Sequence, residues 1–140
     1  MATRAPIEMK GLDHLVIRCV DPAAMHRFYC DLIGCELIRH NAEFDLYHLR
    51  AGEQLIDLIA VDGILGKRGG AAPGDEGRNL DHFAIRIAEF DEAALHAWVS
   101  DNDLEIVEEG PRYGADGTGP SIYLRDPEKN IVELKGPSTD

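Results

Sequence analysis

One segment occurs twice in this chain of 140 residues. Residues 11–18 read GLDHLVIR and residues 79–86 read NLDHFAIR, so Leu-Asp-His, Ile and Arg stay in register. A repeat at this spacing indicates that the chain is built from two copies of one supersecondary unit. Because a single copy cannot enclose its own apolar face, we expect the two copies to pack together.

The repeated segment has the alternating pattern that is typical of a β-strand. Leu15 and Ile17 share one face, which is suited to burial against helices. The opposite face carries a histidine, a small apolar residue and an arginine in both copies: His14, Val16 and Arg18, then His82, Ala84 and Arg86. We interpret this face as the lining of a shared polar cavity, in which the symmetry of the repeat brings two histidines together.

A helix and three short strands are predicted to follow each repeated strand. Asp21-Pro22 and Gly34 are start and stop signals for the first helix, and Asp91 begins the second. The predicted strands span residues 35–39, 44–50 and 54–61 in the first half, and residues 104–108, 121–125 and 130–135 in the second. Each half is therefore predicted to be a β-α-β-β-β module.

The chain is expected to form a single α+β domain over residues 1–140. Module one covers about residues 11–62, a glycine-rich connector residues 63–78, and module two about residues 79–136. A second glycine-rich segment, residues 110–120, interrupts module two. From their composition, the connector is expected to be mobile and the second segment to be a lid or a flexible linker.

The last predicted strand of each half carries one carboxylate in an apolar sequence, Asp57 in one half and Glu133 in the other. Their neighbours supply the helix-packing face, so each carboxylate points to the face that carries the histidines. Burying a carboxylate without a partner is costly. We therefore predict a divalent metal ion, one of Zn, Ni, Mn, Fe or Co, bound by four ligands. These are His14, His82, Glu133 and Asp57, of which Asp57 is the weakest because its side chain is short.

Strand parity places five further side chains on the cavity face: Arg18, Arg86, His48, Ser121 and Tyr123. We predict that they contact the substrate, with the arginines holding an anionic group. In the alternative interpretation the arginines only neutralise the two carboxylates, and the histidines are ordinary core residues. The other side chains then form hydrogen bonds to the ligands without contacting the substrate.

Three motifs resemble those of the vicinal oxygen chelate superfamily, which includes glyoxalases, bleomycin resistance proteins and dioxygenases. They are DHLV at residues 13–16, FYCDLIG at residues 28–34 and, the most specific, RDPEKNIVEL at residues 125–134. The resemblance implies two paired βαβββ modules that form a cupped mixed sheet around a metal cavity. It also places the family's ligand positions on the four residues named above, with one metal per site.

The resemblance further implies a reaction. Glu133 or Asp57 would be the catalytic base that moves a proton next to a carbonyl group, assisted by the metal. The position of Arg18, four residues after the first ligand, favours a glyoxalase-I-like lyase or isomerase acting on a small oxygenated substrate. Glutathione or another thiol is a candidate co-substrate. The alternatives are a fosfomycin-type thiol transferase, a small extradiol dioxygenase and a non-enzymatic drug-binding resistance protein.

The charge of the chain limits its partners. A net charge of -12, without any basic stripe, argues against nucleic acid and anionic membranes. No segment is long and apolar enough for a signal peptide or a membrane span. We therefore expect a cytoplasmic protein that acts on a small molecule. A homodimer is also expected, since modules of this superfamily pair either within one chain or across two.

Overall fold

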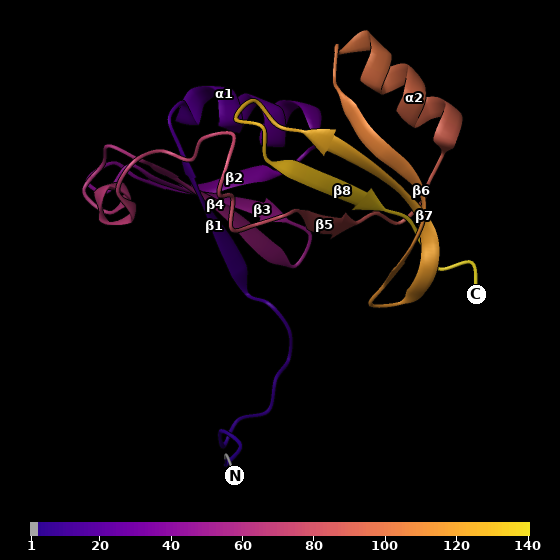
Figure 1. Ribbon diagram of the computed structural model, residues 1–140, viewed down its shortest axis with the longest axis horizontal. Coiled ribbons are helices and arrows are strands. Elements are labelled where there is room, and N and C mark those ends of the chain that lie inside the picture. The colour runs from indigo at the N-terminus through magenta and orange to yellow at the C-terminus, as the bar shows by residue number, and fades with distance from the viewer. Residues whose placement is uncertain (1–2) are drawn as a thin grey trace.

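The computed structural model describes residues 3–140. Its first half runs through one strand, a helical segment and three strands (Figure 1). These elements are β1 (His14–Cys19), α1 (Pro22–His26), the π-helical turn η1 (Arg27–Leu32), β2 (Glu36–Asn41), β3 (Leu46–Ala51) and β4 (Gln54–Ala60). A short 3-10 turn, η2 (Gly66–Gly69), follows in the connector.

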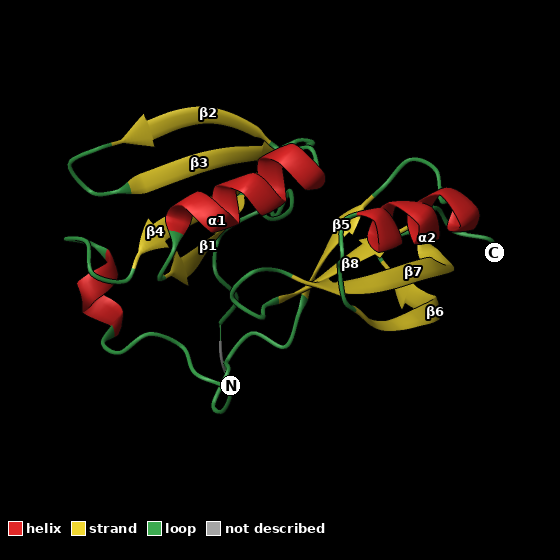
Figure 2. Ribbon diagram, turned by 90° about the horizontal axis from the view of Figure 1, so that it is seen from above, coloured by secondary structure: helices red, strands yellow, loops and turns green. Residues whose placement is uncertain are grey.

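The second half repeats this order. Its elements are β5 (Phe83–Arg86), α2 (Glu92–Asp101), β6 (Ile106–Gly114), β7 (Gly117–Arg125) and β8 (Ile131–Lys135). The strand orders are β1-β4-β3-β2 in the first sheet and β5-β8-β7-β6 in the second, so the two sheets have the same topology. The predicted α+β class and the two β-α-β-β-β modules are confirmed. Figure 2 shows the sheets side by side, with α1 and α2 next to the first and second sheet respectively.

Both helices begin in the same way, as the sequence predicts. The carboxylate of Asp21 accepts a 3.0 Å hydrogen bond from the backbone N–H of Ala24, and Asp91 does the same for Ala94. Such caps satisfy donors that have no partner within the helix. The helices then bury apolar side chains against their sheets, in a core that contains Met25, Phe28, Tyr29 and Val99.

The two halves meet through one continuous apolar core and a set of polar contacts. The buried hydroxyl group of Tyr29 donates a 2.8 Å hydrogen bond to the carboxylate of Asp126, in the turn before β8. The carboxylate of Glu128, in the same turn, accepts hydrogen bonds from the backbone N–H groups of Val20 and Asp21. The RDPEKN motif therefore fixes module two against the start of the first helix.

The structure of the second glycine-rich segment differs from the prediction. Residues 110–120 are part of a long β-hairpin rather than a lid or a linker, because β6 and β7 pair as far as Gly114 opposite Gly117. A tight turn at Ala115 and Asp116 joins them, and Gly117 adopts a φ of 113°, which glycine tolerates best. Glycine allows another part of the backbone to lie close to this hairpin. A Cβ atom on Gly119 would lie 2.3 Å from the carbonyl oxygen of Pro137.

The connector is held by the guanidinium group of Arg18. This group donates hydrogen bonds to the carbonyl oxygens of Gly66, Gly69, Gly70 and Ala71, at 2.6–3.2 Å. Few side chains other than arginine can satisfy four carbonyl groups at once. In the described residues, 3–140, no helix is long and apolar enough to cross a membrane.

Candidate metal and substrate site

The first sheet positions one group of predicted site residues. Asp57 of β4 lies opposite Val16 of β1 and opposite His48 of β3, so its side chain shares a face with the His14 side. Asp57 is only 4% exposed, and its Oδ1 atom lies 2.9 Å from Nδ1 of His48. We call His14, His48 and Asp57 the first half-site.

The second sheet repeats this arrangement with other side chains. Glu133 of β8 lies opposite Ala84 of β5 and opposite Tyr123 of β7, which is the register position that Asp57 has in the first sheet. It is 4% exposed. The hydroxyl group of Ser121 donates a 3.0 Å hydrogen bond to its Oε2 atom, and its Oε1 atom lies 3.5 Å from Nε2 of His82. We call His82, Ser121 and Glu133 the second half-site.

Both histidines of the repeat are oriented by the aspartate that precedes them. The Nδ1 atom of His14 lies 2.7 Å from a carboxylate oxygen of Asp13, and the same distance separates His82 and Asp81. The hydrogen bond that His14 donates to Asp13, with a smaller contribution from the charge of Asp57, raises the pKa of His14. Holding Nδ1 by a carboxylate leaves Nε2 free to bind a metal, as in most metal-bound histidines. The two aspartates belong to the repeated Leu-Asp-His segment, but their role was not predicted from it.

A basic and aromatic wall borders the second half-site. Tyr123 packs edge-on against His82, with ring centroids 5.1 Å apart, and the guanidinium group of Arg112 lies 5.5 Å from the centre of the Tyr123 ring. Burial, and then the neighbouring carboxylate of Glu133, raise the pKa of Tyr123 to about 12. Lys135, opposite Ser121, is 6% exposed. Arg112 and Lys135 are absent from the predicted set.

The two predicted arginines have partners outside the half-sites. Arg18 lies on the expected strand, but its guanidinium group binds the connector. Arg86 forms an ion pair with Asp116 in the hairpin turn, in which its Nη1 atom donates to both carboxylate oxygens at 2.8 and 3.1 Å. Their contact with a substrate stays a prediction.

Of the four predicted ligands, His82 and Glu133 lie 3.5 Å apart, and Asp57 is on the same face of the first sheet as His14. Among the described residues, the one set of three or more His, Cys, Asp or Glu side chains with ligand atoms within 4.8 Å of one another is Glu92, His96 and Glu109. That set lies elsewhere on module two. Within the described part of a single chain, the predicted ligands are thus divided between two half-sites on two sheets, and no three of them have ligand atoms within 4.8 Å of one another.

Comparison with known families agrees with this architecture. The family model of the Glyoxalase/Bleomycin resistance protein/Dioxygenase superfamily matches residues 11–134, which include both half-sites. The chain belongs to this superfamily. The resemblance inferred from the repeated strand and the RDPEKNIVEL motif is thus confirmed.

Solved structures share the superfamily fold. An integron cassette protein from the mobile metagenome of V. cholerae is 24% identical, with a TM-score of 0.70 over 94% of this chain and 98% of its own. The fosfomycin resistance protein FosX from Listeria monocytogenes is 18% identical, with a TM-score of 0.70 over 94% of each chain. Lactoylglutathione lyase from Agrobacterium tumefaciens is 18% identical, with a TM-score of 0.64 over 91% of this chain and 94% of its own. At these identities the similarity concerns the fold.

Proposed function

We propose that this protein is a divalent-metal-dependent enzyme of the glyoxalase type, in which the first half-site of one chain meets the second half-site of another copy. The matched geometry of the half-sites carries this proposal. Each has an imidazole whose Nδ1 atom is held by the preceding aspartate, and a buried carboxylate at the same register position. One half-site has too few donors for a closed metal site, whereas the two together supply the imidazoles of His14 and His82 and the carboxylates of Asp57 and Glu133.

The surface of the single chain supports assembly with a second copy. Strands β1 and β5, which lead from the two histidines, are both at the edge of their sheets. The imidazoles of His14 and His82 are 45% and 35% exposed. Leu12, Val16 and Leu80, which lie in the repeated segments, are exposed as well. Exposed apolar side chains next to unpaired strand edges favour a surface that another chain covers.

The donors present fit a divalent metal. His14, His82 and Glu133 would hold the ion, with Asp57 as the fourth ligand or as a side chain that leaves this position to the substrate. When bound, the metal would supply Lewis-acid stabilisation of negative charge on substrate oxygens. The buried carboxylates and the aspartate-held imidazoles are the chain's own contribution to this chemistry.

Glu133 is the best-placed base. The hydrogen bond from Ser121 fixes its Oε2 atom, and this leaves Oε1 on the side of His82. Because the carboxylate is buried and held in one orientation, it can take a proton from a substrate carbon next to a carbonyl group and return it to a neighbouring atom. Asp57, which is fixed by His48, is the second candidate base.

The substrate is expected to carry a negative charge. Arg112 and Lys135 lie on the same face of the second sheet as Ser121 and Tyr123. Arg112 pairs with Gly119 and Lys135 pairs with Ser121, and residues 119, 121 and 123 of β7 share one face. Two cations next to a buried carboxylate favour an anionic group on the substrate. A small oxygenated acid or a glutathione hemithioacetal has this character.

Two measurements test this function. Metal analysis of purified protein, corrected for any ion at other sites, is expected to find transition metal that the double variant His14→Ala/His82→Ala loses. With the hemithioacetal of methylglyoxal and glutathione in D₂O, the protein is expected to form product and to exchange a carbon-bound proton with solvent. Glu133→Gln should still bind the substrate but stop the exchange; unchanged exchange would reject Glu133 as the base.

A fosfomycin-type thiol transferase is the second candidate. The hydroxyl groups of Ser121 and Tyr123, with Arg112 close by, form a wall suited to a phosphonate group. The same metal-loaded protein should therefore be incubated with fosfomycin and a thiol. Consumption of fosfomycin without turnover of the hemithioacetal would assign this second function and exclude the first.

A further inference from the structure

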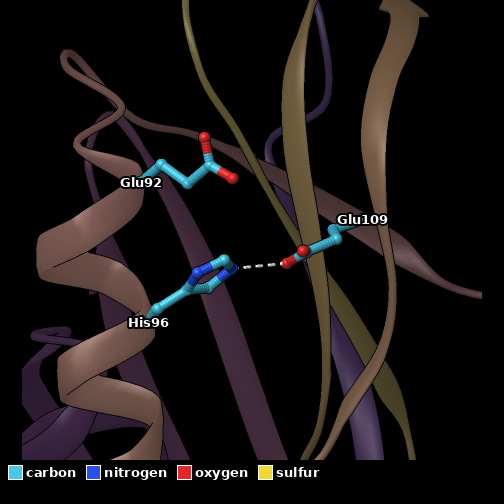
Figure 3. Close-up of side chains that lie close together, drawn as sticks. All are labelled: Glu92, His96 and Glu109. Carbon is cyan, nitrogen blue, oxygen red and sulfur yellow. Dashed lines mark hydrogen bonds and ion pairs between the residues drawn. The ribbon is translucent and has the colours of Figure 1, made fainter.

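A separate group of ligand-type side chains lies between α2 and β6 (Figure 3). Glu92 and His96 are one helical turn apart on α2, so their side chains project from the same face. Glu109 of β6 faces them, and its Oε2 atom lies 2.7 Å from Nε2 of His96. One ligand atom from each of the three residues lies within 4.8 Å of the other two.

This cluster is distinct from the second half-site because it lies on the other face of the same sheet. Glu109 pairs with Ile122, a core residue that is completely buried on the helix side. The preceding residue, Glu108, pairs with Tyr123, which belongs to the face of Glu133. Side chains of neighbouring strand residues point to opposite faces. The sheet therefore separates the cluster from Glu133.

The charges of the cluster are unbalanced without a cation. The carboxylates of Glu92 and Glu109 both lie next to the imidazole of His96. A divalent ion bound by the neutral imidazole would compensate both negative charges.

A cavity next to the cluster gives an ion room for further ligands. It has a volume of about 490 Å³, and both Glu92 and Glu109 line it, together with Phe90, Pro111 and Pro120. His96 and Glu109 are 41% and 42% exposed, so an ion from solution can reach them. One nitrogen and two carboxylate donors beside open space are the donor set and geometry of a site that completes its shell with water.

We propose that Glu92, His96 and Glu109 form a second divalent-cation site, suited to Zn²⁺, that joins α2 to β6 on the outer face of module two. The site does not depend on the proposed enzyme function. It binds its ion within one chain, whereas the proposed catalytic site needs both half-sites.

Zinc titration of the full chain tests this site. The protein His14→Ala/His82→Ala lacks both imidazoles of the proposed catalytic site and should still bind one Zn²⁺ per chain in isothermal titration calorimetry. Adding His96→Ala should weaken that binding by about tenfold or more, because one of three protein ligands is lost. Glu109→Gln keeps the size of the side chain and should also weaken it. His26→Ala, the equivalent position on α1, is the matched control and should change nothing.

A second measurement locates the bound ion without relying on a variant of the cluster, which could lose zinc binding simply because it is misfolded. In the ¹H–¹⁵N NMR spectrum of His14→Ala/His82→Ala, Zn²⁺ should shift the amide signals of residues 92–96 and 108–110. Circular dichroism should confirm that each variant is folded. If no zinc binds to the double variant, or if His96→Ala leaves the binding unchanged, the three side chains form only an ion pair and the proposal is wrong. Failure of the catalytic site would instead appear as equal zinc binding by the unmodified protein and the double variant.

Discussion

The hydroxyl group of Tyr29 donates a 2.8 Å hydrogen bond to the carboxylate of Asp126, so a helical residue of module one is bonded to the RDPEKN turn of module two. Both groups are buried. The backbone N–H groups of Glu128 and Asn130 and the side-chain amide of Asn130 also donate to Asp126. A buried carboxylate depends on such donors. This network connects the motif that identifies the family to the packing of the two halves.

We expect Tyr29→Phe to destabilise the protein by about 1–3 kcal/mol, because a buried carboxylate loses one of its donors. The ring itself stays, so its packing against Phe28 and Phe83 is retained. Urea unfolding followed by circular dichroism measures the change. Tyr113→Phe is the control, since Tyr113 is 85% exposed. Equal stability of the two variants would contradict the role of the hydrogen bond.

The same tyrosine is expected to limit stability in alkaline solution. Burial, followed by the nearby charge of Asp126, raises the pKa of Tyr29 well above its usual value of about 10 in the folded protein. When folding raises the pKa of an acid, the folded state holds the proton more tightly than the unfolded state does. The resulting stability is fully present below the pKa of the unfolded state, and it is lost as the pH rises toward the pKa of the folded state. Above about pH 10 this loss amounts to as much as about 1.4 kcal/mol per pH unit.

The free energy of unfolding should therefore fall more steeply with pH for the unmodified protein than for Tyr29→Phe. It is measured from about pH 9 to about pH 11, because an unperturbed tyrosine ionises in this range. Cys19 and Tyr123 also have raised pKa values, of about 12, but they contribute equally to both proteins. Parallel curves for the two proteins would show that Tyr29 ionises as freely in the folded state as in the unfolded state.

The connector provides a test of close packing at a glycine. A Cβ atom on Gly66 would lie 1.7 Å from the carbonyl oxygen of Ala60, whereas nothing lies within 4 Å of one on Gly74. Gly66→Ala must displace backbone and should cost about 1–3 kcal/mol. Gly74→Ala should be neutral or slightly stabilising, since it reduces the freedom of the unfolded chain. Thermal unfolding of both variants measures the difference, and similar melting temperatures would refute the close approach.

The sequence predicted the elements of the fold well because local signals and the repeat agree. Asp21 and Asp91 mark the helix starts, and the alternation around His14 and His82 gives the correct faces. The hairpin of residues 110–120 was missed because glycine and proline indicate a loop when read alone. Their role is fixed by tertiary contacts instead, as the approach of Gly119 to Pro137 illustrates.

The alternation of side chains along regular strands identified the residues of the two half-sites, but alternation cannot place side chains where a strand is irregular, as in β6. The pairing of β6 and β7 shifts by one residue between Ile106 and Glu108. Such a bulge moves the following side chains to the other face of the sheet. It turns Glu109 toward His96, a neighbour that is distant in sequence, so the cluster on α2 could not be found from periodicity. Parity also placed Arg18 on the correct strand, but it could not foresee that the connector would occupy its guanidinium group.

The aspartates of the repeat are expected to control metal affinity. Asp81 holds Nδ1 of His82 at 2.7 Å, yet its side chain is 94% exposed and contributes little to packing. In a protein that also carries His96→Ala, Asp81→Ala should lower the affinity for Zn²⁺ by about 10–100-fold, because the imidazole loses its orientation and basicity. Asp62→Ala is the control at an exposed aspartate next to the connector. Competition with a chromophoric chelator measures the affinity, and urea unfolding should find all three proteins equally stable. An unchanged affinity would mean that Asp81 does not orient the ligand.

The assembly of the catalytic site can be tested by mixing two inactive chains. One chain carries His14→Ala and Asp57→Asn, and the other carries His82→Ala and Glu133→Gln, both in the His96→Ala background. If each site combines half-sites from two chains, a mixed dimer has one site without substitutions and one with all four. Random pairing of equal amounts gives about half mixed dimers, so about a quarter of the metal and activity of the unmodified dimer should return.

The matched control is a mixture of two chains that both carry substitutions in the first half-site, which should recover nothing. Subunits are exchanged by unfolding and refolding the mixture, and size-exclusion chromatography establishes that dimers form. If the half-sites met within one chain, every site in a mixed dimer would keep two altered ligands, and mixing would restore neither metal nor activity. Recovery in the first mixture alone therefore requires that His14 and Asp57 of one chain act together with His82 and Glu133 of the other.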